Sequence, residues 1–209
     1  SDILRARFPT RSAGGIERAI IYLPDGSVSN ADGSVGLTIR DGCIEDVFDL
    51  LDRVIDTDLP ILIQGESGTG KELIARTIHQ VGLRKNKPFV PVNCASIPAT
   101  LFEREFFGHR KGAFSGAHAD SPGYLDMADG GTLFLDEVSE LTVNIQAKLL
   151  RAIEGGGYRP VGAPESKMAD FRIISASNAA LDDKVNSGHM RNDFFYRIHV
   201  IHIQLPPLR

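Results

Sequence analysis

The chain has 209 residues, a length that suggests one domain with a smaller appendage. Hydrophobic residues make up 42% and charged residues 24%, which is ordinary for a soluble globular protein with a buried core. The net charge of -4 argues against a domain-wide nucleic-acid surface, and no apolar run approaches the ~18 residues of a membrane span. Cys43 and Cys94 lack CxxC spacing, which argues against a disulfide framework and for a cytoplasmic location.

The first 40 residues carry the weakest pattern, and we interpret residues 1–40 as an N-terminal extension or linker. Two similar turn sequences, Asp25-Gly26-Ser27-Val28 and Asp32-Gly33-Ser34-Val35, predict a small hairpin there. The chain begins with Ser1, so we expect a fragment of a longer protein. Residues 41–209 are the expected main domain, which opens with an amphipathic helix whose apolar face is Ile44, Val47, Phe48, Leu51, Val54 and Ile55.

A glycine-rich stretch follows the first apolar run of the main domain. Gly65-Glu66-Ser67-Gly68-Thr69-Gly70-Lys71-Glu72 lies between Ile61-Leu62-Ile63 and a helical pattern. This is the context of a phosphate-binding P-loop, in which backbone N–H groups and a helix N-terminus face a phosphate and Lys71 reaches the outer phosphates of a nucleoside triphosphate. Glu72 replaces the usual Ser or Thr that binds magnesium, so the metal must be held elsewhere. The alternative is a chance glycine turn before a helix.

Short apolar segments alternate with helical patterns along the rest of the chain. This alternation predicts an α/β fold with a mostly parallel five-stranded sheet flanked by helices. The expected strands cover residues 61–63, 89–92, 132–135, 171–176 and 200–204, and the expected helices cover 73–81, 99–107, 143–153 and two short stretches around Gly188.

Two finer predictions concern the faces of these elements. His199 and His202 lie three residues apart in an extended-looking run, so they should face opposite sides of the sheet. The helix after the P-loop should turn an apolar face to the sheet, made by Leu73, Ile74, Thr77, Ile78 and Val81.

An acidic pair follows the third predicted strand, at the sheet edge where ligands of parallel sheets bind. Asp136-Glu137 comes directly after Thr132-Leu133-Phe134-Leu135, which is the pattern of a Walker B motif. Asp136 would hold Mg²⁺, directly or through water, and Glu137 would orient or deprotonate the water that attacks the γ-phosphate. The alternative is an N-cap pair that opens the next helix.

Two asparagines also end predicted strands. Asn178 would hydrogen-bond the γ-phosphate or the attacking water, and Asn93 would hold Glu137 in an idle position. The alternative for both is an ordinary turn asparagine.

Two arginines lie near the C-terminal end of the chain, six residues apart. Arg191 or Arg197, or both, would act as arginine fingers on a γ-phosphate bound by a neighbouring subunit, because the transition state spreads negative charge over the phosphate oxygens. The alternative is a surface salt bridge, for example between Arg197 and Asp193.

Residues 108–123 form a long segment without periodicity, and such loops usually carry function. Within it, Gly112-Ala113-Phe114-Ser115-Gly116-Ala117 places one aromatic residue among small ones, without charge. A Phe on a small-residue tip suits insertion into a partner. The alternative is that Phe114 packs into the core and the loop is passive.

This loop carries a family resemblance. Glu105-Phe106-Phe107-Gly108-His109-Arg110-Lys111 followed by residues 112–117 resembles the signature of bacterial enhancer-binding proteins, the AAA+ ATPases that activate sigma-54 RNA polymerase. The resemblance extends over about residues 43–209 and includes the P-loop with Glu72, the stretch from Ala128 to Glu137, and Leu205-Pro206-Pro207-Leu208-Arg209.

The resemblance implies a P-loop NTPase fold of AAA+ type and a partner. Phe114 and Ser115, within the partner-binding stretch 112–117, would lie on the loop that touches sigma-54. Residues 158–169 would form a second surface loop that moves with the first.

The resemblance also implies a reaction, with ATP and Mg²⁺ as cofactors. Asn93 and Glu137 would form a switch that senses the γ-phosphate, and Asn178 would fall in the sensor I segment. Arg191 and Arg197 would be trans-acting fingers, which implies self-association into a ring, usually a hexamer.

The chain departs from the family pattern at two places. Ser115 stands where Thr is usual, which keeps the hydroxyl and removes a methyl group, so we expect function to persist with weaker coupling to sigma-54. The chain ends at Arg209, before the helical lid and the DNA-binding helix-turn-helix of the family. We therefore expect this fragment to bind nucleotide weakly and to form no stable ring.

The leading hypothesis is an ATP-dependent transcriptional activator that remodels sigma-54 RNA polymerase at promoters. A second is another AAA+ ATPase that remodels a different protein partner. A third is a nucleotide-gated binding module that does not hydrolyse ATP.

Overall fold

The computed structural model describes residues 57–205 and three short strands before them. These strands are β1 (Ile21–Tyr22), β2 (Ser27–Ser29) and β3 (Val35–Thr38). They pair antiparallel in the order β1-β2-β3, so the expected hairpin is present and has a third strand. The helix predicted over residues 44–55 lies outside the described residues.

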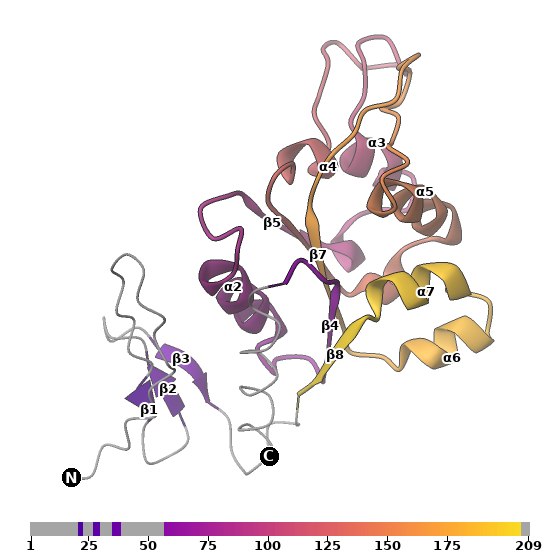
Figure 1. Cartoon of the computed structure of the whole chain (residues 1–209). Coiled ribbons are helices and arrows are strands. Elements are labelled where there is room, and N and C mark those ends of the chain that lie inside the picture. Colours follow the sequence, from indigo (N-terminus) through magenta and orange to yellow (C-terminus); the bar gives the residue numbers. More distant parts are fainter. Residues whose placement is uncertain (1–20, 23–26, 30–34, 39–56, 206–209) are drawn as a thin grey trace.

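Five parallel strands form the central sheet, in the order β5-β6-β7-β4-β8 (Figure 1). The predicted α/β fold with a parallel five-stranded sheet is therefore confirmed. The strands are β4 (Ile61–Gln64), β5 (Phe89–Asn93), β6 (Thr132–Asp136), β7 (Arg172–Ser177) and β8 (Ile201–Gln204).

Helices pack on both faces of this sheet, with α2 on one side and α5 and α7 on the other (Figure 1). None of the helices in the described part of the chain is long and apolar enough to cross a membrane. The α-helices are α2 (Lys71–Val81), α3 (Phe102–Phe107), α4 (Tyr124–Met127), α5 (Val143–Ile153), α6 (Leu181–Asn186) and α7 (Asn192–Ile198).

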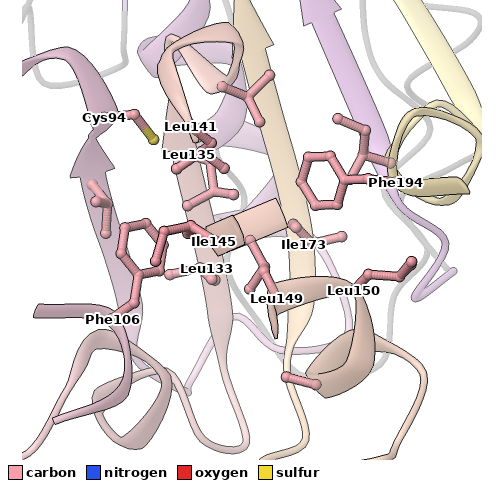
Figure 2. Close-up of a cluster of buried hydrophobic side chains, with 14 of the residues drawn as sticks. Cys94, Phe106, Leu133, Leu135, Leu141, Ile145, Leu149, Leu150, Ile173 and Phe194 are labelled. Carbon is pink, nitrogen blue, oxygen red and sulfur yellow. The ribbon is translucent and has the colours of Figure 1, made fainter. Parts of the chain in front are cut away.

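The alternation of side chains along each strand divides the core into two clusters. Ile61 and Ile63 of β4 face α2, whereas Leu62 between them faces the opposite side, with α5 and α7. Figure 2 shows the larger cluster, in which aromatic and aliphatic side chains from strands and helices meet. Its labelled members include Phe106, Leu133, Ile145, Leu149, Ile173 and Phe194.

The predicted apolar face of α2 is partly wrong. Ile74 and Ile78 are buried as expected, but Leu73 and Val81 are 39% and 46% exposed. The helix begins at Lys71, two residues before the predicted start. From this start, Ala75 and His79 lie on the buried face in place of Leu73 and Val81. The buried His79 is accommodated because its Nδ1 hydrogen-bonds Thr132 Oγ1 at 2.9 Å.

The prediction for His199 and His202 is also wrong. His199 lies at the C-terminal end of α7 and His202 lies in β8, so the two residues do not share one strand. Their rings meet edge to face, with centroids 4.9 Å apart. The helix predicted from residue 99 begins later, at Phe102, because a turn closed by the Leu101 N–H and the Pro98 carbonyl precedes it.

Candidate functional site

The carboxyl ends of the parallel strands meet at one edge of the sheet, as predicted. Asn93 and Asp136 are paired neighbours at the ends of β5 and β6, and Gln64 is paired with Ser177 at the ends of β4 and β7. The P-loop leaves β4 at this edge, so the acidic pair, both asparagines and the glycine loop gather in one region.

The P-loop is shaped by glycines in left-handed backbone conformation. Gly68 and Gly70 have φ values of 84° and 83°, a region that favours glycine. The space around Gly68 is open, with no heavy atom within 4 Å of an added Cβ. Gly70 is also the N-cap of α2, so the helix N-terminus opens directly from the loop. This geometry suits an anion bound by backbone N–H groups.

Lys71 is buried, with its ammonium group folded onto the loop. Its Nζ donates to the carbonyls of Gly65 at 3.0 Å and Glu66 at 3.1 Å. The carboxylate of Glu137 lies 3.9 Å from the same nitrogen. One cation therefore links the P-loop to the end of β6.

Glu137 is the only described non-glycine residue with positive φ, at φ 51° and ψ 52°. A left-handed conformation costs a side-chain-bearing residue about 1–2 kcal/mol. The turn directs the carboxylate across the sheet edge, where Oε2 accepts a hydrogen bond of 3.3 Å from the backbone N–H of Asn178. Such strain is frequent at functional sites.

Asp136 and Asn93 are placed next to this turn. Asp136 Oδ1 accepts a hydrogen bond of 3.1 Å from the Glu137 N–H. Asn93 Oδ1 accepts one of 3.2 Å from the Ser96 N–H and so caps the short 3₁₀ helix Cys94–Ser96. The carboxamide oxygen of Asn93 is thus engaged locally, and the switch between Asn93 and Glu137 stays a prediction.

Glu72 directs its carboxylate along the outside of α2. Its Oε1 accepts from Arg76 at 2.9 Å and 2.6 Å, and its side chain is 51% exposed. The Glu72 carboxylate is thus paired with Arg76, one helical turn further along α2.

The two candidate finger arginines are both exposed on or beside α7. Arg191 forms a two-pronged ion pair with Asp193, at 2.9 Å and 2.7 Å. The Arg197 guanidinium donates to the Ile153 carbonyl at 3.3 Å. A surface salt bridge is therefore present, as the alternative expected, but Arg191 forms it, and the example pairing of Arg197 with Asp193 is wrong.

Phe114 lies at the tip of the first loop and is 37% exposed. Its ring lies 4.9 Å from the His109 ring and 5.8 Å from the Arg104 guanidinium carbon. The tip is closed by a 2.8 Å hydrogen bond from the Gly112 N–H to the Ala117 carbonyl. Phe114 therefore rests against polar neighbours at the surface, and the alternative of a core position is wrong.

Residues 108–123 and 158–169, which we call the loop pair, are fastened to each other. Arg110 donates its N–H to the Val161 carbonyl, and Val161 donates to the Gly108 carbonyl, each at 2.9 Å. At the tips, an added Cβ on Gly162 would lie 2.7 Å from the Ala113 Cβ. The two loops project together from the same end of the domain (Figure 1).

Asp126 of α4 joins both members of the loop pair at their base. It accepts hydrogen bonds from the Gly123 N–H at 3.0 Å, from Tyr158 Oη at 2.8 Å and from Lys167 Nζ at 2.7 Å. The sequence reasoning missed this residue, and no local pattern distinguishes it. It also missed Gln64. The signal was available, because Gln64 is a polar residue at the end of an apolar strand, directly before the P-loop.

The parallel sheet, the P-loop and the acidic strand end define a P-loop NTPase domain. The family model described as the Sigma-54 interaction domain matches residues 37–204, and the chain belongs to this family, that of the sigma-54-dependent transcriptional activators with an AAA+ domain.

Individual relatives agree with this assignment. The chain is 46% identical over 170 residues to the DNA-binding transcriptional regulator NtrC of Rhizobium meliloti, covering 81% of this chain and 35% of that protein. It is 49% identical over 157 residues to the response regulator protein PilR of Pseudomonas aeruginosa, covering 75% and 35%. The crystal structure of NtrX from Brucella abortus in complex with ATP superposes with a TM-score of 0.75 at 35% identity, covering 82% of this chain and 37% of that one. The chain thus spans about a third of these proteins.

Proposed function

We propose that this domain hydrolyses ATP and uses the hydrolysis cycle to remodel sigma-54 RNA polymerase at promoters. The observation that carries the proposal is the contact between the P-loop lysine, the Walker B glutamate and the Asn178 backbone at one sheet edge. A similar fold solved with ATP, in NtrX from Brucella abortus, supports ATP as the nucleotide.

The site residues suit phosphoryl transfer because they are held by contacts that a nucleotide can replace. Lys71 would exchange its two carbonyl partners for phosphate oxygens, which carry full charge and attract an ammonium group more strongly. The Glu137 carboxylate, aimed across the edge by its backbone turn, would orient the attacking water and accept its proton. Asn178 would hold its place beside that water.

Mg²⁺ fits this edge only as an ion that is bound jointly by the protein and the nucleotide. Residues 57–205 contain no group of three or more His, Cys, Asp or Glu that could hold a metal ion. The Asp136 carboxylate, which has one oxygen on the Glu137 N–H, suits an ion that takes its other ligands from phosphate and water. When bound, the ion would neutralise charge on the phosphates.

The loop pair would deliver the work of hydrolysis to sigma-54 through Phe114. Strand β7 supports this link, because it begins three residues after the second loop and ends next to Asn178. A change at the nucleotide edge would therefore reach the loop pair through one rigid strand. Ser115 keeps a hydroxyl next to Phe114 for contact with the partner.

Assembly and location complete the proposal. Arg191 and Arg197 are exposed, as fingers that reach a neighbouring subunit must be. We propose a ring, a hexamer in the intact protein, acting in the cytoplasm and bound to DNA through a region outside this chain.

The test is Phe114→Ala in the intact protein, with ATP turnover and open-complex formation by sigma-54 RNA polymerase measured side by side. We expect turnover to stay within about twofold and open complexes to be lost, because Phe114 touches the partner and not the nucleotide. Met127→Ala, another exposed apolar residue, should leave both activities unchanged. Normal open-complex formation by Phe114→Ala would sink the partner assignment, and absence of turnover in the wild type would sink the ATPase.

A further inference from the structure

Gln64, the last residue of β4, connects two strands through its side chain. Its Nε2 donates to the Ala179 carbonyl at 2.7 Å, and its Oε1 lies 2.9 Å from His202 Nε2. Strand β4 lies between β7 and β8 in the sheet. The carboxamide therefore spans from β8 to the turn that follows β7, directly before the P-loop.

The partners of Gln64 fix both its orientation and the tautomer of His202. A carbonyl oxygen can only accept, so the amide nitrogen must face Ala179 and the amide oxygen must face His202. Because that oxygen also only accepts, His202 must carry a proton on Nε2. The network thus assigns a tautomer that a side chain alone would leave open.

His202 is itself held by the end of α7. Its ring meets the His199 ring edge to face at 4.9 Å, and the His199 ring packs 4.8 Å from buried Phe195. Packing from α7 therefore orients the imidazole that orients Gln64.

The turn that Gln64 holds carries Asn178. Ser177 accepts a 3.1 Å hydrogen bond at its carbonyl from the Gly65 N–H, and Gln64 adds the bond to Ala179, so both flanks of Asn178 are tied to the start of the P-loop. The Asn178 N–H in turn meets the Glu137 carboxylate at 3.3 Å. A displacement of this turn would therefore move Asn178 and the Glu137 carboxylate out of place together.

We propose that Gln64, oriented by His202, is a positioning residue for ATP hydrolysis that fixes the Asn178 turn against the P-loop. The inference rests on the proposed function for the reaction it serves. The two amide atoms of Gln64 hydrogen-bond Ala179 and His202, which lie outside the P-loop. Its loss should therefore lower kcat and leave nucleotide affinity nearly unchanged.

The experiment compares single and double variants in the intact protein, with kcat measured for ATP and Kd measured for a slowly hydrolysed analogue. Gln64→Met removes both hydrogen bonds at similar size, and kcat should fall on the order of tenfold, with Kd changed less than about threefold. His202→Phe should lower kcat about threefold, and His202→Gln, which returns an N–H donor, should restore most of it. The double variant Gln64→Met/His202→Phe should be no slower than Gln64→Met, because both act in one chain of contacts.

A matched control is provided by Gln204, which pairs with Gln64 in the sheet and is exposed. Among the described residues, its side-chain amide makes one contact, of 3.5 Å with the Leu205 carbonyl, so Gln204→Met should keep wild-type kcat. Unchanged kcat in Gln64→Met, equal effects of His202→Phe and His202→Gln, or multiplying effects in the double variant would each overturn the inference.

A second readout separates this inference from the proposed function. The ¹⁵N shifts of neutral His202 should report the Nε2–H tautomer, and Gln64→Met should shift the Asn178 amide signal while Gln204→Met does not. If the wild type hydrolyses no ATP, the proposed function fails and these signals alone decide whether Gln64 positions the turn. The opposite tautomer, or an unmoved Asn178 signal, would contradict it.

Discussion

The nucleotide edge and the loop pair are built in opposite ways. At the edge, the Glu137 carboxylate reaches its neighbours through long contacts, 3.9 Å to Lys71 Nζ and 3.3 Å to the backbone N–H of Asn178. In the loop pair, backbone hydrogen bonds of 2.9 Å join Arg110 to Val161 and Val161 to Gly108. We therefore expect the edge to exchange its partners for a ligand at low cost, and the loop pair to move as one body.

The largest expected effect is on ATP turnover, and it tests the role of Glu137 at the nucleotide edge. Glu137→Gln keeps the size of the side chain but removes its charge and its basicity, so ATP turnover should fall at least about 100-fold. ATP affinity should change little, because Lys71 and the loop remain. The hydrogen-exchange protection of the Arg110 and Val161 amides should also stay at the wild-type value.

Glu140→Gln is the matched control, since Glu140 is half exposed in the next turn and pairs with Lys184 at 3.7 Å. It should turn over ATP at the wild-type rate. Substantial turnover in Glu137→Gln would remove the catalytic assignment and favour the non-hydrolysing binding module.

The next effect tests whether the loop pair is one body. Gly162→Ala places a Cβ 2.7 Å from the Ala113 Cβ, in a backbone with φ of 76° that disfavours a side chain. Strain and overlap together should cost about 2 kcal/mol locally. The Arg110 and Val161 amides should then exchange about thirtyfold faster, since 1.36 kcal/mol corresponds to a factor of ten.

Gly155→Ala separates contact from strain. Gly155 has nearly the same φ, 75°, but no heavy atom within 4 Å of an added Cβ. It should leave the exchange of Arg110 and Val161 unchanged, and Ala113→Gly should partly rescue Gly162→Ala. Equal effects of Gly162→Ala and Gly155→Ala would mean that the tips do not press on each other.

Much of the fold could be predicted because its determinants are local. Apolar runs gave the strands within a few residues, and polar residues after them, such as Asn93 and Asp136, gave the edge at which they meet. Parallel strands end at the same edge whatever their order, so this inference needed no knowledge of the order β5-β6-β7-β4-β8.

The remaining features depend on contacts between distant segments. Which residues of α2 face the sheet depends on where the helix begins after the P-loop. Periodicity alone therefore assigned exposed Leu73 to the buried face. His202 contacts Gln64 across 138 positions of sequence, and Gly162 contacts Ala113 across two loops. Neither separation leaves a pattern in the sequence near the residues concerned.

The smallest effect concerns the base of the loop pair, where Asp126 accepts three hydrogen bonds. Burial alone would raise the pKa of Asp126, but hydrogen bonds from Lys167, the Gly123 N–H and Tyr158 outweigh it and leave the pKa below its ordinary value. Asp126→Asn removes the charge, and the free energy of unfolding at pH 7 should fall by roughly 1 kcal/mol.

The sign of the pH dependence follows from the lowered pKa. A carboxyl group with a lower pKa in the folded state stabilises the fold above its unfolded pKa of about 4, and loses that contribution as pH falls through the folded value. The stability difference between wild type and Asp126→Asn should therefore be full at pH 7 and shrink below about pH 4. Asp120→Asn, at an exposed ion pair with Arg110 in the same loop, should change stability less. A wild-type difference that stays constant down to acid pH would show that Asp126 acts through size and not through charge, and that the loop pair rests on backbone contacts alone.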